Sequence, residues 1–307
     1  MHAAQVTQWG ETPKYVETPK PELPSTDSNT IQIEVQATGL HQIVRARVTG
    51  THYSAKTLPH TLGIDGVGVT TSGQQVYFST LAIPFGSYSK FVNVPRADVA
   101  PLPEGVDAVQ VAAAMNPMLS SWMALRTRTT NLPPNFSVLI LGATSASGKI
   151  AIDVAHHLGA KRVIGVARNL SALQSLGLDE AIQMQDPVEN TDFSSLGHVD
   201  VILDYVYGPI TAHVLGSLKT MQLVQFVQVG TLSTQVMELE GALLRSKNLI
   251  MRGSGPGAWT MERLREELPL MAQATKALKR IDVKVAKLSD IESVWDEKTK
   301  ERLVFIL

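Results

Sequence analysis

The chain has 307 residues, of which 44% are hydrophobic and 18% charged, and its formal net charge is −1. This length favours two domains, and the composition is typical of a globular protein with a sizeable core. The 27 basic and 28 acidic residues form no blocks, which argues against nucleic acid or an anionic membrane as the main partner. No apolar run approaches the ~18 residues that span a bilayer. Residues 1–5 lack the pattern of a secretory signal, so we expect a cytoplasmic location.

The sequence contains no cysteine. Disulfides, thiol nucleophiles and cysteine-ligated zinc sites are therefore excluded. Eight histidines remain, but His156 and His157 are adjacent in a predicted helix, and no His-x-x-x-His pattern occurs. We expect no metal site.

The first hundred residues are predicted to be rich in β-strands. Residues 30–37 alternate apolar and polar side chains, which is typical of a half-buried strand. Glycine and proline punctuate this part of the chain, as in a compact β fold with many turns. Further strands are predicted at residues 63–69, 75–79 and 88–94, and a helix at residues 107–128.

Strands and helices alternate from residue 137 onward. Strands are predicted at residues 137–141, 162–167, 181–182, 199–204 and 223–229, and helices at residues 147–158, 170–176 and 210–218. Alternation with short connections predicts an α/β fold with a parallel, doubly wound sheet. A helix at residues 261–278 and a β-like segment at residues 302–307 follow. We expect these last segments to return to the first domain.

The connection between the first strand and the first helix of this region has the pattern of a dinucleotide-binding loop. Residues 142–148 read GATSASG, so Ser145 replaces the middle one of the usual three glycines. Small side chains let the backbone approach a pyrophosphate, and the helix N-terminus offers unpaired N–H groups and a partial positive charge. The alternative is a tightly packed turn that binds nothing. The predicted cofactor-binding residues here are Gly142, Thr144, Ser145, Ala146, Ser147 and Gly148.

The end of the second strand indicates which dinucleotide binds. An acidic residue at this point holds the ribose 2′-hydroxyl in NAD-selective sites, but this strand ends with Arg168 and Asn169. A guanidinium pairs with a 2′-phosphate through charge-assisted hydrogen bonds, whereas a carboxylate would repel it. The sequence therefore favours NADPH over NADH as the cofactor. The alternative is an ordinary surface arginine.

Four further segments occur in a characteristic order. Residues 59–69 read PHTLGIDGVGV, residues 86–92 read GSYSKFV, and residues 112–115 and 120–125 read AAAM and SSWMAL. With the loop, they resemble the medium-chain dehydrogenase/reductase superfamily, specifically its zinc-free quinone oxidoreductase branch. The resemblance covers nearly the whole chain.

This resemblance implies a GroES-like, β-rich substrate domain built from residues 1–118 and 252–307. It also implies a Rossmann domain that binds NADPH at residues 119–251, and a homodimer. The positions of the Cys and His ligands of zinc-dependent relatives hold His41 and Ile64 here, so that ligand set is absent. Many zinc-free relatives have Asn in place of His41 and Thr in place of Ser120, which leaves the substrate open.

Chemistry without zinc favours reduction of a quinone or an α,β-unsaturated carbonyl. The carbon that accepts hydride is already activated by its carbonyl group, and hydrogen bonds or water can meet the charge on the oxygen. The candidate catalytic residues are Tyr53, His52, His41 and Asn116, and the alternatives are structural roles or, for Asn116, a cap at a helix end.

The nicotinamide half of the cofactor is expected near the ends of later strands, at Tyr205, Val229, Gly230 and Ser254. Two other functions stay open. One is a non-catalytic NADPH-binding sensor or structural protein, and the other is a trans-acting enoyl reductase of a biosynthetic pathway.

Overall fold

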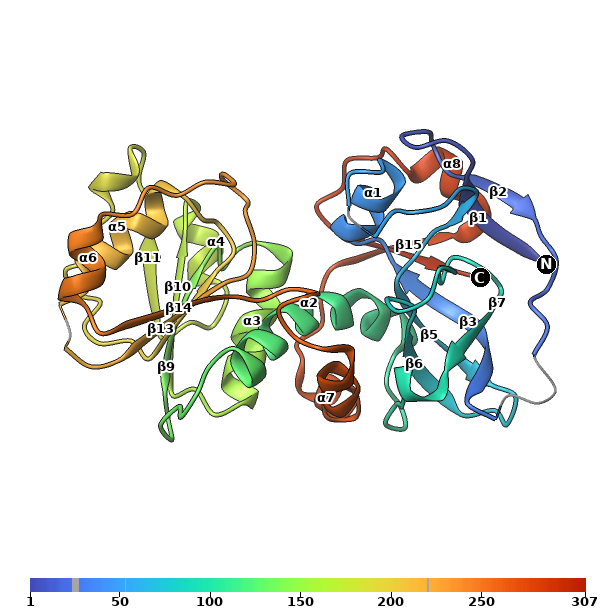
Figure 1. The fold of residues 1–307 in the computed structure, drawn as a ribbon, viewed down its shortest axis with the longest axis horizontal. Coiled ribbons are helices and arrows are strands. Elements are labelled where there is room, and N and C mark those ends of the chain that lie inside the picture. The colour runs from blue at the N-terminus through green and yellow to red at the C-terminus, as the bar shows by residue number, and fades with distance from the viewer. Residues whose placement is uncertain (24–27, 53, 220) are drawn as a thin grey trace. The chain divides into compact units, whose positions relative to one another are not determined.

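The structure is a computed structural model that describes residues 1–23, 28–52, 54–219 and 221–307. The chain forms two compact units (Figure 1). Unit 1 comprises Met1–Asn116, Met261–Lys276 and Arg280–Leu307, and unit 2 comprises Pro117–Thr260 and Ala277–Lys279. The domain bounds predicted from the sequence, at residues 118/119 and 251/252, stay a prediction.

Unit 2 is built on a six-stranded parallel sheet with the strand order β11-β10-β9-β12-β13-β14. The strands are β9 (Ser137–Leu141), β10 (Arg162–Ala167), β11 (Glu180–Gln183), β12 (Val201–Asp204), β13 (Val224–Gln228) and β14 (Leu249–Gly253). The central strands are continuous apolar runs because helices cover both faces of the sheet. This confirms the predicted parallel sheet, although the sequence reading missed β14.

The helices of unit 2 lie on both sides of this sheet, with α3 on one face and α5 and α6 on the other (Figure 1). They are α3 (Ala146–His157), α4 (Leu170–Gln174), α5 (Pro209–Ser217), α6 (Gly241–Ser246) and the 3-10 turn η2 (Val188–Asn190). The apolar side of α5 and the sheet enclose a core in which Leu139, Ile164, Ile202 and Phe226 are buried, and α3 buries Ile150, Ile152 and Val154.

Unit 1 contains a seven-stranded sheet and a three-stranded sheet. Its strands are β1 (His2–Val6), β2 (Lys14–Glu17), β3 (Thr30–Gly39), β4 (His60–Thr61), β5 (Asp65–Thr70), β6 (Gln75–Ser79), β7 (Phe91–Pro95), β8 (Val99–Pro101), β15 (Val283–Lys287) and β16 (Arg302–Ile306). Because β16 pairs antiparallel with β3, the end of the chain completes this unit, as predicted.

The helical elements of unit 1 are short, apart from α7. They are α1 (Gln42–Val48), α7 (Met261–Ala274), α8 (Ile291–Val294), η1 (Arg96–Asp98) and η4 (Leu288–Asp290). The turn η3 (Thr275–Ala277) and the long helix α2 (Ala108–Thr127) each have residues in both units. Arg265 of α7 forms a bidentate ion pair with buried Asp98, with N–O distances of 2.7 and 3.0 Å, which fixes α7 to this unit.

Candidate functional site: a nucleotide pocket at the sheet edge

The loop between β9 and α3 is held tightly by its own backbone. Gly142 has a φ of +87°, a conformation that favours glycine. The N–H groups of Gly142 and Ala143 both donate to the carbonyl of Val166, at 2.8 and 3.2 Å, and Ser145 N–H donates to Gly142 O. The loop is therefore pinned to the neighbouring strand before any ligand binds.

The first turn of α3 leaves backbone donors available. Ser145 is the N-cap, and its Oγ accepts a hydrogen bond from Gly148 N–H at 3.0 Å. Helix geometry leaves the N–H groups of Ala146 and Ser147 without a partner inside the helix. Those two donors, the Ser145 hydroxyl hydrogen and the helix dipole together make an anion-binding end.

Gly148 is required by packing. A Cβ atom there would lie 2.2 Å from the carbonyl oxygen of Gly142 and 2.8 Å from the Cα of Ala143. The last glycine of the motif therefore lets α3 approach the loop, whereas the middle position tolerates serine because Ser145 serves as the helix cap.

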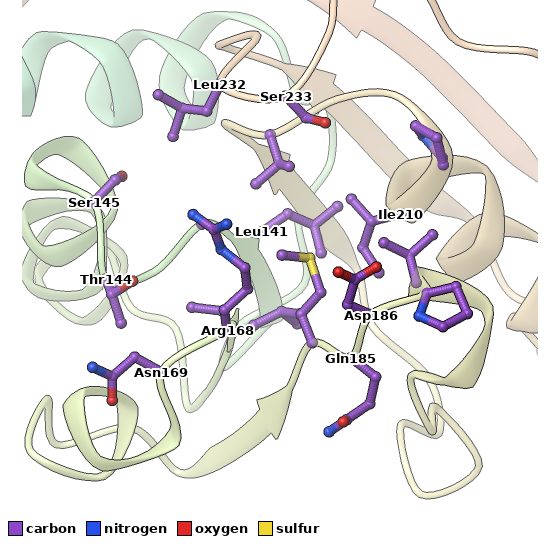
Figure 2. A pocket seen from close by; sticks show the side chains of 18 of the residues that line it. Leu141, Thr144, Ser145, Arg168, Asn169, Gln185, Asp186, Ile210, Leu232 and Ser233 are labelled. Carbon is purple, nitrogen blue, oxygen red and sulfur yellow. The ribbon is translucent and has the colours of Figure 1, made fainter.

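A cavity of about 720 Å³ opens beside this loop (Figure 2). It lies at the carboxyl ends of β9, β10, β11 and β12, where parallel sheets bind their ligands. Five of the predicted cofactor residues line it, namely Gly142, Thr144, Ser145, Arg168 and Asn169. The apolar part of its lining includes Leu141, Val166, Met184, Val206, Pro209 and Ile210.

Arg168 is exposed at the mouth of β10, and its side chain extends into this cavity (Figure 2). Its backbone carbonyl accepts a hydrogen bond from Gln183 Nε2. Within the described ranges, no ion pair or hydrogen bond engages its guanidinium. A cation left open in a cavity beside an anion-binding helix end suits a second phosphate group.

Asn169 has a structural role that the sequence reading did not assign. It is the N-cap of α4, and its Oδ1 accepts hydrogen bonds from Ala172 N–H at 3.0 Å and from the Ser171 hydroxyl at 2.8 Å. Asn169 also lines the cavity.

Asp204, at the end of β12, organises the opposite wall. It is fully buried, and its Oδ1 accepts from the N–H groups of Val206 and Tyr207, while Oδ2 accepts from the Thr211 hydroxyl at 2.6 Å. Burial raises the pKa of this carboxyl, and the three hydrogen bonds oppose that rise. Asp204 thereby fixes the turn that carries Val206 into the cavity wall. In the sequence, the only signal for this role is a carboxylate at the end of a predicted strand.

The residues expected around the nicotinamide lie at the same edge of the sheet. The N–H groups of Val229 and Gly230 donate to Asp204 O, and Ser254 N–H donates to Gln228 O. Tyr205 is buried, with its hydroxyl 3.2 Å from Ser120 Oγ, and burial raises its pKa to about 12. These four residues are not part of the cavity that Arg168 lines.

His41, a candidate catalytic residue in unit 1, is only 1% exposed. Its Nε2 lies 3.1 Å from Asp65 Oδ1, and Asp65 Oδ2 accepts a hydrogen bond from the Tyr77 hydroxyl. Burial raises the pKa of Tyr77 well above its ordinary value, and the Asp65 carboxylate contributes to the rise. His41 belongs to a closed polar cluster, which fits the structural alternative better than contact with a substrate.

The other catalytic candidates have different surroundings. His52 is half-buried, and its Nδ1 lies 2.7 Å from Ser54 Oγ. Burial lowers its pKa, helped by the charge of Arg47. Tyr53 lies outside the described residues. Asn116 lies inside α2, which continues through Pro117 to Thr127, so the alternative of a cap at a helix end is wrong.

Among the residues that the structure describes, no group of three or more His, Asp or Glu side chains could hold a metal ion. None of the helices in that part of the chain is long and apolar enough to cross a membrane.

Comparison with known proteins gives the family. No family model matches the sequence. A probable NADPH-dependent quinone reductase of Emericella nidulans is 35% identical, and the match covers 100% of both chains. This chain belongs to the medium-chain dehydrogenase/reductase superfamily, in its quinone oxidoreductase branch. The quinone oxidoreductase of Sus scrofa is 28% identical over 47% of the chain and 46% of its own length.

Solved structures of this superfamily have the same fold. A mycobacterial quinone oxidoreductase superposes with a TM-score of 0.80 at 20% identity, and the match covers 100% of both chains. Escherichia coli quinone oxidoreductase, solved with NADPH, gives a TM-score of 0.76 at 22% identity, again over 100% of both chains. The predicted combination of a β-rich domain and a Rossmann domain is therefore confirmed.

Proposed function

We propose that this chain is an NADPH-dependent, zinc-independent reductase that transfers a hydride to a quinone or an α,β-unsaturated carbonyl. The observation that carries the proposal is Arg168, a cation that no described residue pairs with, in a cavity beside the dinucleotide loop. The 35% identical relative, named as a probable NADPH-dependent quinone reductase, supports it. That name also favours catalysis over a non-catalytic sensor or a trans-acting enoyl reductase.

The residues of unit 2 suit a dinucleotide with three phosphate groups. The N–H groups of Ala146 and Ser147, with the hydroxyls of Thr144 and Ser145, would hold the pyrophosphate. Gly142 and Gly148 keep that backbone close to the ligand, and Arg168 would pair with the 2′-phosphate. Asn169 adds a polar group beside Arg168, and Tyr205, Val229, Gly230 and Ser254 are proposed for the nicotinamide half.

NADPH, when bound, supplies the hydride. The part of the chain is to hold the reacting groups, exclude water and meet the charge that develops on the acceptor oxygen with hydrogen bonds. His52, whose lowered pKa favours the neutral imidazole, is proposed to donate such a hydrogen bond. Tyr53 and Asn116 are the other candidate donors. His41 is the weakest candidate because it is buried.

We further propose a cytoplasmic homodimer. The edge strand β14 supports the dimer, because no other strand of the described residues pairs with its outer side and its residues Leu249, Ile250 and Met251 are only half-buried. Light scattering after size-exclusion chromatography would measure the mass, and a single 33.3 kDa species would refute the dimer.

The test of the activity uses purified protein with NADPH or NADH and a panel of quinones and conjugated enones. We expect oxidation of NADPH, much slower oxidation of NADH, and no loss of rate after treatment with a metal chelator. Tight NADPH binding without turnover on any acceptor would refute the reductase and favour the sensor. A rate that falls on chelation and returns with zinc would refute the metal-free mechanism.

A further inference from the structure

The cavity continues past Arg168 toward the edge of the sheet. After β11 the chain follows the neighbouring strand for one more residue, since Met184 N–H donates to Ala167 O at 2.9 Å. The next segment, residues 185–189, then lines the far end of the cavity. The cavity thus has a phosphate end, at the loop and Arg168, and a distal end bounded by this segment.

The distal end has the character of a slot for a flat ring. Met184, which precedes this segment, and Pro187 and Val188 within it contribute apolar surfaces to the distal end. If the phosphates of NADPH occupy the other end, as the proposed function requires, the adenine ring must lie here. Apolar side chains can cover the faces of the ring, but they cannot distinguish one purine from another.

Two carboxylates line this end, those of Asp186 and Glu189, and the orientation of Asp186 makes it the candidate. Asp186 is exposed and lines the cavity, and no hydrogen bond or ion pair of its side chain occurs in the described parts of the chain. In the view of Figure 2, the Asp186 carboxylate and the Arg168 guanidinium both point upward, whereas the Gln185 amide points downward. The Gln185 amide also donates to Gln183 O.

We infer that Asp186 reads the 6-amino group of adenine and so selects the base of the cofactor; this inference rests on the proposed function. An ionised carboxylate only accepts hydrogen bonds. The 6-amino group of adenine is a donor, whereas hypoxanthine and guanine carry a carbonyl oxygen at the same position. Asp186 therefore favours adenine and opposes a 6-oxo purine.

Asp186 has a second effect that the test must separate. Its negative charge lies in the same cavity as the 2′-phosphate site, so it opposes binding of any phosphorylated dinucleotide. Replacing Asp186 lowers the affinity for NADPH by removing the hydrogen bond to the base, and raises it by removing the negative charge. The ratio of the affinities for NADPH and for its hypoxanthine analogue cancels the charge effect, because both ligands carry the same phosphates.

The experiment measures dissociation constants of the full chain for NADPH and for reduced nicotinamide hypoxanthine dinucleotide phosphate, its deaminated analogue. We expect wild type to bind NADPH about tenfold more tightly than the analogue, as for one charge-assisted hydrogen bond. Asp186→Asn should reduce the ratio to about two, because an amide can donate to the 6-oxygen. Glu189→Gln is the matched control, since it removes the same charge from the same cavity, and it should keep the wild-type ratio.

The outcomes separate this inference from the proposed function. A ratio that is the same in wild type and Asp186→Asn, with NADPH still bound, would overturn the inference and leave the proposed function standing. A ratio that falls equally in Glu189→Gln would also overturn it, because net charge would then explain the effect. Failure of wild type to bind NADPH at all would overturn both.

Discussion

Two arginines stand at opposite ends of β10, and their surroundings differ. At its start, Arg162 donates to both oxygens of Glu180, at 2.6 and 2.8 Å, and to the carbonyls of Leu196 and His198. Past its end, Arg168 extends into the cavity with no such partner among the described residues. The same residue type on one strand is thus a structural tie at one edge of the sheet and an open ligand group at the other.

The same contrast holds for the rest of the two edges. At the amino edge, Asp200 Oδ2 accepts from Ser137 N–H and from the Ser137 hydroxyl, at 2.7 and 2.8 Å, and Asp200 Oδ1 lies 3.1 Å from His198 Nε2. At the carboxyl edge, the helix N-terminus after Ser145 keeps donors unused. Arg162 and Asp200 at the amino edge are thus satisfied within the protein, whereas Arg168 and the helix N-terminus at the carboxyl edge are available to a ligand.

The largest expected effect comes from adding a single methyl group at Gly148, where α3 packs against the loop. Gly148→Ala places a Cβ atom 2.2 Å from Gly142 O, a backbone atom that cannot move without the loop. We expect a loss of about 3 kcal/mol of unfolding free energy from overpacking, together with loss of NADPH binding. Urea unfolding and NADPH titration measure the two effects.

Gly216 offers the matched control at the far end of α5. A Cβ atom there meets nothing within 4 Å, and the backbone is helical. Gly216→Ala should therefore leave NADPH binding unchanged and stabilise the protein by up to about 1 kcal/mol. Unchanged stability and binding in Gly148→Ala would show that the loop is not held as tightly as the structure indicates.

Much of the fold could be predicted from the sequence because unit 2 is built from local patterns. The strands at residues 137–141 and 162–167 are apolar runs, and their predicted bounds are those of β9 and β10. The strand β14 was missed because its residues are half-buried at the sheet edge and include Arg252, so the apolar signal is weak.

The part of the site that could be predicted consists of residues adjacent in sequence to predicted strands. Arg168 and the loop lie next to strands that the sequence identifies, so their side chains could be placed. Asp186 and Asp204 reach the cavity region only through pairing between strands far apart in sequence, and no spacing rule shows that one is open and the other buried. His41 shows the reverse limit, because its burial with Asp65 and Tyr77 depends on contacts that sequence periodicity does not report.

Exchanging each arginine for alanine tests the comparison directly. Arg168→Ala should weaken NADPH binding about thirtyfold, the equivalent of about 2 kcal/mol for a charge-assisted contact, and leave NADH binding and the unfolding free energy nearly unchanged. Arg162→Ala should do the opposite. It leaves Glu180 and two carbonyls without their donor, so we expect a loss of about 2 kcal/mol in stability with an unchanged NADPH/NADH ratio.

Isothermal titration with NADPH and with NADH, and urea unfolding, give the six numbers needed: two dissociation constants and an unfolding free energy for each variant. Arg245→Ala, an exposed change on α6 in the same unit, controls for loss of a positive charge. An equal loss of affinity for NADPH and NADH in Arg168→Ala would refute its assignment to the 2′-phosphate.

The smallest expected effect is electrostatic and concerns two carboxylates, that of Asp200 just before β12 and that of Asp204 at the end of this strand. Burial alone would raise the pKa of Asp200, but the hydrogen bonds from Ser137, with His198, lower it below its ordinary value of 3.8. Its stabilising contribution is therefore complete above pH 3.8 and is lost as the pH falls through the folded-state pKa. Asp204 has the opposite sign, because burial raises its pKa. Its ionisation costs stability as the pH rises from 3.8 through its folded-state pKa.

Urea unfolding between pH 7 and pH 3 separates these contributions. Below pH 4, Asp200→Asn should lose less stability than wild type, by under about 1 kcal/mol. Between pH 4 and neutrality, Asp204→Asn should remove a slope in which wild type loses stability as the pH rises. If the unfolding free energies of wild type and Asp200→Asn change in parallel below pH 4, the ionised Asp200 carboxylate does not stabilise the amino edge. The contrast between the two edges would then depend on the arginines alone.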